Sequence, residues 1–124
     1  LAHRIEAGCD FYLMPSQFEP CGLNQMYSLR YGTIPIVRAT GGLDDSVIDF
    51  TQSHLKANGI KFQEYSARAL AKAIRKALAI YGKPDLFRRF RKNAMAADFS
   101  WKQTVEEYLK VYNAAKFFSP ERNH

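Results

Sequence analysis

The sequence predicts an α/β fold built on a small parallel sheet. Three short segments rich in apolar or β-branched residues, 10–14, 33–38 and 60–62, have the length of buried strands. Segments whose apolar residues recur every three or four positions, which is the helical pattern, lie between and after these strands. Strands that alternate with helices form βαβ units, in which the strands are parallel and the crossovers right-handed.

The composition is that of an ordinary globular protein. The chain has 124 residues, of which 47% are hydrophobic and 24% charged, and this balance argues against disorder. This length accommodates one domain or part of a larger one, and the absence of Met at position 1 indicates a processed or excised segment. Cys9 and Cys21 are too few for a disulfide framework or a zinc site. We therefore expect a reducing, cytoplasmic location.

Neither a membrane nor a secretory route is indicated. No apolar run approaches the roughly 18 residues that cross a bilayer, and residues 1–4 lack the layout of a signal peptide.

Positive charge is concentrated in one part of the chain. The net charge is +6, and residues 66–92 hold nine Lys and Arg against Asp85 alone, so the remaining residues together are slightly acidic. Lys and Arg on the polar side of amphipathic helices are commonly solvated. We favour this interpretation, and a basic nucleic-acid-binding module remains open as an alternative function.

The first third of the chain is expected to contain two helices and a strand. Residues 1–7 have the pattern of a helix end, closed by Gly8. A buried strand follows at 10–14. Residues 22–31 again show the helical spacing, and Gly32 ends that helix.

The middle of the chain contains the second predicted strand and a long loop. Pro35 lies in the strand at 33–38, and because it has no N–H it favours a sheet edge or a strand start. The glycine pair at 41–42 ends this segment. Residues 49–58 are polar and predict a surface loop, preceded by at most one helical turn at 45–48.

Three helices are predicted after the third strand. Ser66 caps the first, Pro84 suits the first turn of the second, and residues 100–103 have the form of a capping box that opens the third. The side chains expected on their apolar sides are Leu70, Ile74, Ala77, Leu78 and Tyr81, then Leu86, Phe87, Phe90 and Met95, and finally Val105, Tyr108, Leu109 and Tyr112, with Trp101 as a core anchor. All three helices are expected to pack over the sheet.

So small a sheet, with an incomplete beginning, predicts the second half of a nucleotide-binding, Rossmann-like domain. Residues 1–64 would form the strand–loop–helix core with the ligand loops, and residues 65–124 the helical part.

The first candidate ligand loop, residues 16–25, follows the first strand. Ligands of open α/β sheets bind beyond the carboxyl ends of the strands. The free N–H groups of Gly22, Leu23 and Asn24 at a helix start suit a phosphate. Glu19, just before them, is either a charge partner of the helix or an acceptor for sugar hydroxyls. Both features together predict a sugar-nucleotide site.

The second candidate loop, residues 39–45, follows the next strand. Gly41 and Gly42 permit a close backbone approach, although such a pair is weak evidence by itself. Its position gives it value, because we expect it to lie beside the Glu19 loop at the same sheet edge. Asp44 and Asp45 are expected to cap a short helix rather than to act in acid–base chemistry.

Five segments carry a family resemblance. They are Glu-Pro-Cys-Gly-Leu-Asn-Gln-Met-Tyr at 19–27, Arg-Tyr-Gly-Thr-Ile-Pro at 30–35, Thr-Gly-Gly-Leu at 40–43, Asn-Gly-Ile-Lys-Phe at 58–62 and Asp-Phe-Ser-Trp at 98–101. In these the chain resembles the C-terminal half of bacterial glycogen synthase and plant starch synthase, the donor domain of a GT-B glycosyltransferase. Retaining GT-B transferases share a Glu-x7-Glu pattern, of which Glu19 matches the first acid. Tyr27 occupies the second, as in the glycogen and starch synthase branch.

The resemblance implies roles for individual residues. Glu19 would act in catalysis and bind the glucose hydroxyls of ADP-glucose, and the backbone at 21–23 would contact the sugar and diphosphate. Asn24 stands where the family usually has a Thr that contacts the distal phosphate. Tyr27 would face the nucleotide or, as we favour, support the loop from the core. The implied substrate-binding set is Glu19, Cys21, Gly22, Leu23, Asn24, Tyr27, Thr40, Gly41 and Gly42.

The resemblance also implies a reaction, the transfer of glucose from ADP-glucose to the non-reducing end of an α-1,4-glucan with retention of configuration. The resemblance implies that this reaction needs no metal and no cofactor. The family's phosphate-neutralising Arg and Lys precede this segment, so we expect it to need an N-terminal GT-B domain in cis and to be inactive alone. The last helix commonly crosses to that domain, which would expose Tyr108, Tyr112, Phe117 and Phe118 in the chain by itself and favour self-association. Another retaining GT-B transferase with a different nucleotide sugar is the alternative within enzymes.

Overall fold

The computed structural model describes residues 1–117 of the chain. Its elements, in chain order, are α1 (Ala2–Gly8), β1 (Phe11–Met14), α2 (Asn24–Tyr31), β2 (Ile34–Arg38), α3 (Gly41–Ser46), β3 (Ile60–Phe62), α4 (Ala67–Tyr81), α5 (Pro84–Ala96) and α6 (Trp101–Phe117). The strands form one parallel sheet in the order β1-β2-β3, and Ile36 of β2 lies opposite Leu13 on one side and Ile60 on the other. The predicted α/β class with a parallel sheet is confirmed.

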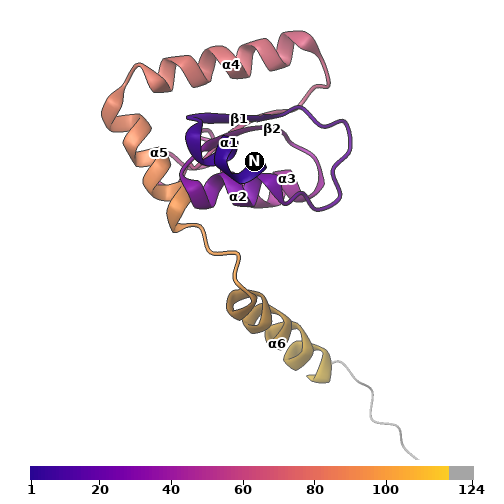
Figure 1. The fold of residues 1–124 in the computed structure, drawn as a ribbon. Coiled ribbons are helices and arrows are strands. Elements are labelled where there is room, and N and C mark those ends of the chain that lie inside the picture. The colour runs from indigo at the N-terminus through magenta and orange to yellow at the C-terminus, as the bar shows by residue number, and fades with distance from the viewer. Residues whose placement is uncertain (118–124) are drawn as a thin grey trace, which may run out of the picture.

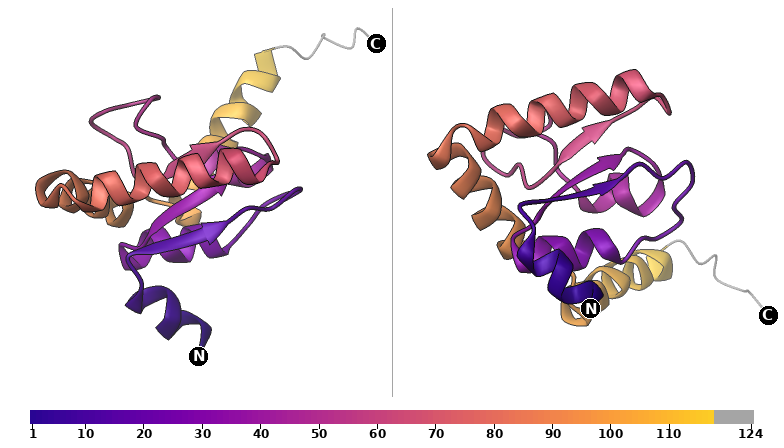
Figure 2. Two further views of the ribbon diagram at one scale, coloured as in Figure 1. Left: turned by 90° about the horizontal axis from the view of Figure 1, so that it is seen from above. Right: turned by 45° about the horizontal axis from the view of Figure 1, so that its top comes forward.

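Helices cover both faces of the sheet. α4 lies across one face, α2 and α3 lie against the other, and α5 runs along one end (Figures 1 and 2). On the α4 face, Ile36 packs in one buried cluster with Ala73 and Ala77. On the opposite face, Val37 packs with Leu43 in a second cluster. Because β2 is buried on both faces, its sequence is a continuous apolar run without alternation.

Pro35 lies in the central strand, so the predicted sheet-edge position is wrong and the alternative, a strand start, is correct. The amide of Ile34 donates to the Asp10 carbonyl next to β1, at 3.0 Å. Amides alternate along a strand, so the position of Pro35 faces the β3 side, and the pairing of β2 with β3 begins only at Ile36. The missing donor therefore falls where no ladder bond is needed.

The buried side of α4 differs from the predicted stripe. Ala77 is buried as predicted, together with Ala73 and Ile80. Three other members of the predicted stripe, Ile74, Leu78 and Tyr81, are exposed. Small side chains let the helix lie close to the sheet, and in an Ala-rich helix the large apolar residues do not by themselves identify the buried side. α5 shows the same shift at its end, where Ala94 is buried and Met95 is exposed.

The prediction that all three C-terminal helices pack over the sheet is wrong for α6. This helix projects away from the sheet (Figure 1). Trp101, the expected core anchor, is 82% exposed. Exposure extends to the rest of the predicted apolar side, namely Val105, Tyr108, Leu109 and Tyr112. The side chain of Phe117 and all of Phe118 lie outside the described part of the chain.

The capping box that predicted the start of α6 is only half formed. The hydroxyl of Ser100 accepts a hydrogen bond from the Gln103 amide at 3.5 Å, while the Gln103 side chain donates to Glu107 instead of returning to Ser100. Such local capping fixes where a helix begins and carries no information about what the helix packs against.

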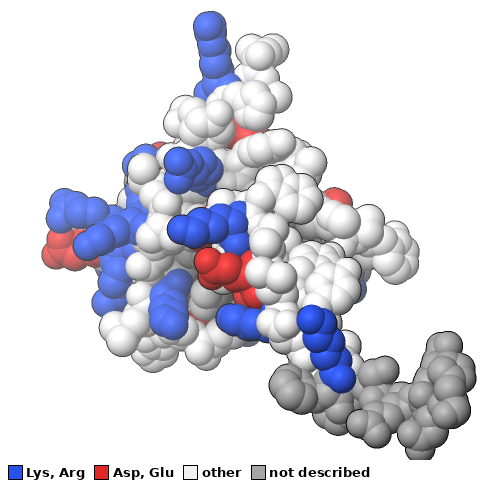
Figure 3. All heavy atoms as spheres, turned by 90° about the horizontal axis from the view of Figure 1, so that it is seen from below, with Lys and Arg blue, Asp and Glu red and all other residues white. Residues whose placement is uncertain are grey.

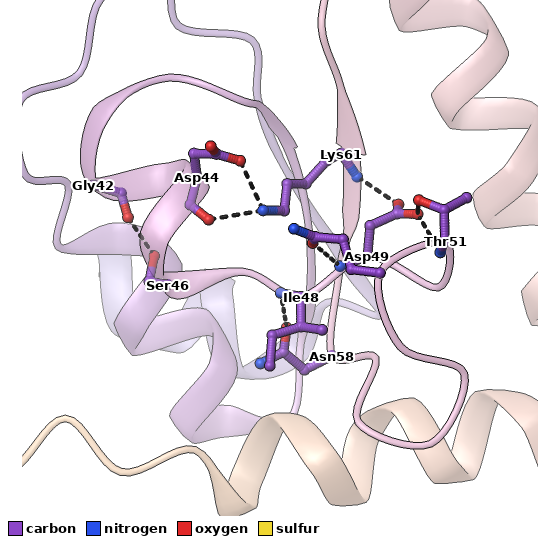
Figure 4. Close-up of polar contacts among 9 residues, drawn as sticks. Gly42, Asp44, Ser46, Ile48, Asp49, Thr51, Asn58 and Lys61 are labelled. Atoms are coloured by element: carbon purple, nitrogen blue, oxygen red, sulfur yellow. Dashed lines mark hydrogen bonds and ion pairs between the residues drawn. The ribbon is translucent and has the colours of Figure 1, made fainter.

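The loop at 49–58 contains a buried ionic network that its polar sequence did not predict. The carboxylate of Asp49 accepts hydrogen bonds from the amides of Thr51 and Lys61, both at 2.9 Å (Figure 4). It also accepts one from Lys76 Nζ at 2.7 Å. Burial by itself raises the pKa of Asp49, but these donors outweigh it and hold the pKa below its ordinary value of 3.8. Asp49 therefore ties the loop to β3 and α4.

Asp49→Asn is expected to lower the free energy of unfolding by about 2 kcal/mol at pH 7, because Lys76 loses its charged acceptor. A lowered pKa in the folded state stabilises the protein above the ordinary carboxyl pKa and ceases to do so as the pH falls through the lowered value. Urea unfolding at pH 7 and at pH 3 should therefore show a smaller difference from wild type in acid. The exposed Asp45→Asn is the control, and an Asp49→Asn difference independent of pH would contradict this account.

Candidate functional site

The two candidate ligand loops meet at the carboxyl edge of the sheet. β1 leads into the segment 15–23 and β2 leads into α3, and both strands point the same way. A β-carbon on Gly41 would collide with the carbonyl oxygen of Glu19, and one on Gly42 with that of Cys21. The predicted juxtaposition of the loops is confirmed, and their backbones are in direct contact.

This contact gives the glycine pair a structural explanation. No side chain fits at either position, because the carbonyl groups of the first loop occupy that space. Gly41 also has a φ of +47°, in the left-handed region that favours glycine. The close approach that Gly41 and Gly42 permit is thus to the neighbouring loop of the same chain.

Free amide groups lie at the start of α2. Gly22 has a φ of +65°, and the helix begins at Asn24 with Leu23 as its N-cap. Within residues 1–117, neither the Gly22 nor the Leu23 amide donates a hydrogen bond. Since Leu23 and Asn24 are exposed, a ligand can reach this helix end, where the helix dipole favours negative charge. The side chain of Asn24 donates to the Tyr12 hydroxyl at 3.4 Å.

Glu19 keeps most of its hydrogen-bonding capacity. Its carboxylate is half-buried and accepts one long hydrogen bond, from the Ser16 hydroxyl at 3.5 Å. Among the described residues it forms no ion pair. A carboxylate in this state, beside free amide donors, is able to accept hydrogen bonds from hydroxyl groups of a ligand.

Tyr27 does not support the loop from the core, so that preference was wrong. Its side chain is 40% exposed and packs edge-on against His3 of α1, with ring centroids 5.1 Å apart. The same imidazole also contacts Tyr31, one turn further along α2. Because α1 lies beside this part of α2, the aromatic side chains meet at the surface.

The expected capping role of Asp44 and Asp45 is also wrong. α3 begins at Gly41, earlier than predicted, and Thr40 occupies its N-cap without a side-chain hydrogen bond. Asp44 lies beyond the cap position and forms an ion pair with Lys61 Nζ at 2.7 Å (Figure 4). Asp45 is exposed.

Two positioning side chains escaped the sequence analysis. Gln25 is fully buried on α2, and its amide donates to the carbonyl groups of Cys21 and Gly22. Arg38, at the end of β2, donates from Nη1 to the Gln17 carbonyl at 2.7 Å. Together they hold the first loop near both of its ends. The available signal for Gln25 was its spacing, since it lies four residues after Cys21 and three after Gly22. No sequence pattern indicated the contact of Arg38.

Figure 3 shows the face of the molecule opposite to α4, and no continuous basic stripe crosses it. Lys and Arg side chains on this face are separated by acidic and uncharged residues. Two basic residues of α4 and α5 form ion pairs, Lys76 with Asp49 and Arg88 with Asp85. Across the described residues, no three His, Cys, Asp or Glu side chains gather as metal ligands. None of the helices in this same region is long and apolar enough to cross a membrane.

The family model for glycosyl transferases group 1 matches residues 2–97. The chain belongs to this family. It is 52% identical over 116 residues to a glycogen synthase of Koribacter versatilis, covering 94% of this chain and 24% of that protein. The glycogen synthase of Thioalkalivibrio sulfidiphilus is 55% identical over 115 residues, covering 90% of this chain and 24% of that relative. The chain thus spans about a quarter of the length of these curated relatives.

Solved structures agree. The catalytic domain of starch synthase IV from Arabidopsis thaliana, bound to ADP and acarbose, matches with a TM-score of 0.72 and 38% identity over 85% of this chain and 22% of that one. The sucrose-phosphate synthase of Thermosynechococcus elongatus matches with a TM-score of 0.60 and 27% identity, covering 93% of this chain and 27% of that chain. Both are GT-B glycosyltransferases, so the predicted resemblance and the GT-B fold are confirmed.

Gly42→Ala is expected to lower the free energy of unfolding by about 3 kcal/mol, because the new methyl group meets the Cys21 carbonyl and the two loops must separate. Gly82→Ala is the matched control. Its β-carbon would lie 3.6 Å from the nearest atom in a helical conformation, so it should be neutral or slightly stabilising. Urea unfolding of the two variants measures this, and equal effects would contradict the loop contact.

Proposed function

We propose that this chain is the donor-binding part of a glycogen or starch synthase, which transfers glucose from ADP-glucose to the non-reducing end of an α-1,4-glucan with retention of configuration. The identity of about half the residues to glycogen synthases, over nine-tenths or more of the chain, carries the proposal. The likeness to a starch synthase structure bound to ADP and acarbose supports it further.

The chemistry of the first loop fits this reaction. Transfer releases a diphosphate and passes through an oxocarbenium-like sugar, so the leaving group needs oriented donors. The free amides of Gly22 and Leu23, at the positive end of α2, would hold the diphosphate. Glu19 would accept hydrogen bonds from the glucose hydroxyls on the other side of the scissile bond. The side-chain amide of Asn24 would donate to the distal phosphate and give up its hydrogen bond to Tyr12.

Three further substrate-binding positions, Thr40, Gly41 and Gly42, would act from the second loop. Thr40 is half-buried at the start of α3, and the backbone at 41–42 lies against the carbonyls of Glu19 and Cys21. The second loop would therefore shape the donor pocket by holding the first loop in place. Tyr27, exposed on α2, would face the nucleotide side.

The proposal requires a second domain in cis. Cationic groups that neutralise the diphosphate and groups that bind the glucan would come from the other three-quarters of the synthase. The exposed apolar side of α6 would pack on that domain. We place the enzyme in the cytoplasm, with no nucleic-acid or membrane partner. Support for this location comes from Cys9 and Cys21, which are both exposed and unpaired, as is usual in a reducing compartment.

Replacement of Glu19 tests the proposal. In the complete synthase, Glu19→Ala should lower kcat by about 100-fold or more, because a polar contact at the reacting sugar is lost. Glucan KM should change little, and the exposed Glu64→Ala should behave like wild type in the same coupled ADP-release assay. The 124 residues alone should not turn over ADP-glucose. Wild-type kcat in Glu19→Ala, or turnover by the isolated chain, would contradict the proposal.

We also propose that the chain alone self-associates through α6, whose exposed aromatic and aliphatic side chains form an apolar surface. Light scattering of the isolated chain should show species larger than a monomer that dissociate on dilution. The double variant Tyr108→Lys, Tyr112→Lys should remain monomeric, because charge replaces the apolar surface. A wild-type chain that stays monomeric at high concentration would refute this.

A further inference from the structure

A buried carboxamide joins the two loops of the candidate site. Gln25 lies two residues into the start of α2, is fully buried, and cannot touch a ligand itself. We infer that Gln25 is the positioning residue that orients the amides of Gly22 and Leu23 toward the donor diphosphate. This inference rests on the proposed function and assigns that site a residue which determines its geometry.

The contacts of Gln25 run to both loops. Its Nε2 donates to the Gly22 carbonyl at 2.9 Å and to the Cys21 carbonyl at 3.2 Å. It also lies 3.2 Å from the hydroxyl of Ser46 on α3, which in turn donates to the Gly42 carbonyl at 2.6 Å. One side chain thus links the first loop, α2 and the glycine pair.

The surroundings fix which way the carboxamide points. Nε2 faces three oxygen acceptors. One of them, the Ser46 hydroxyl, already donates its hydrogen to the Gly42 carbonyl and can therefore only accept from Gln25. A flipped amide would place Oε1 against these oxygens. In the observed orientation Oε1 is buried without a donor among residues 1–117. Leaving a buried oxygen without a donor costs free energy, and the side chain keeps this orientation because Nε2 then donates to the loop carbonyls. We therefore take this donation to be the role of Gln25.

Peptide geometry connects these carbonyls to the free amides. In a trans peptide the C=O and the following N–H point in opposite directions. The Cys21 carbonyl shares its peptide plane with the Gly22 amide, and the Gly22 carbonyl with that of Leu23. Because Gln25 holds both carbonyls toward the interior, both N–H groups must point outward. These are the donors that the proposed function places at the diphosphate.

Preorganisation explains why the contacts of Gln25 should affect binding of the sugar donor and not of the glucan. Amide donors stabilise a leaving group best when they need not reorient as charge develops. Without Gln25, the carbonyls of Cys21 and Gly22 lose this donor, and the two peptide planes are held less firmly. Donor affinity should fall, while the glucan, which the proposal assigns to groups outside this loop, should bind as before.

Gln25→Leu in the complete synthase tests the inference, since leucine has a similar size and no donor. We expect the Kd of ADP, measured by calorimetry, and the KM of ADP-glucose to rise about tenfold, which corresponds to about 1.4 kcal/mol. The glucan KM should stay within about twofold. A purely structural defect would reduce the active fraction and hence kcat, leaving both KM values unchanged.

Two further variants complete the experiment. Ser28→Ala, also fully buried on α2 with an unpartnered hydroxyl, is the matched control and should leave the ADP Kd unchanged. Ser46→Ala breaks the link to Gly42 but keeps Gln25, and should raise the ADP Kd by about twofold to threefold. If Gln25→Leu does not fold, the ADP Kd of Ser46→Ala tests the inference in its place.

The outcomes separate the inference from the proposed function. Wild-type synthase that binds no ADP overturns the proposed function itself. Wild-type binding together with an unchanged ADP Kd in folded Gln25→Leu, or in Ser46→Ala when the former does not fold, overturns the role of Gln25 and leaves the proposed function standing. An ADP Kd that rises in Gln25→Leu but not in Ser28→Ala supports it.

Discussion

The carbonyl oxygens of Glu19 and Cys21 occupy the space where side chains at Gly41 and Gly42 would begin. This backbone contact between two loops at the carboxyl edge of the sheet fixes the geometry of the candidate site. It is possible only because β1 and β2 are parallel neighbours whose following loops emerge side by side. Once the loops touch, the start of α2 has a defined position and its free amides face outward.

Polar side chains then lock the contact. Gln25 holds the inner side of the first loop, and Arg38 holds its outer segment through the Gln17 carbonyl and, from Nε, the Gln63 carbonyl after β3. On the far side of β3, Asp49 ties the long loop to α4. The site thus rests on regular elements through hydrogen bonds to backbone, an arrangement suited to holding donors in place before a substrate arrives.

The sequence predicted the strands well, because each is a short apolar run bounded by glycine or a polar turn, and it predicted the start of α4 because Ser66 has a single clear capping role. It also placed the two loops together, since parallel topology demands it. Buried faces of helices were harder. In α4 the alanines pack and Leu78 does not, and in α6 nothing in the spacing of Tyr108 and Tyr112 distinguishes a core face from an exposed one. Arg38 and Asp49 were not predicted because their partners, two carbonyl groups and a lysine, are distant in sequence and only the fold brings them near. Gln25 was missed although its two carbonyl partners lie only three and four residues before it.

A crystal structure of the complete synthase with ADP-glucose would test whether the first loop is the donor site. The account predicts diphosphate oxygens about 3 Å from the amide nitrogens of Gly22 and Leu23, with the Glu19 carboxylate hydrogen-bonded to the glucose. A nucleotide sugar bound elsewhere, with these amides facing only solvent, would contradict it.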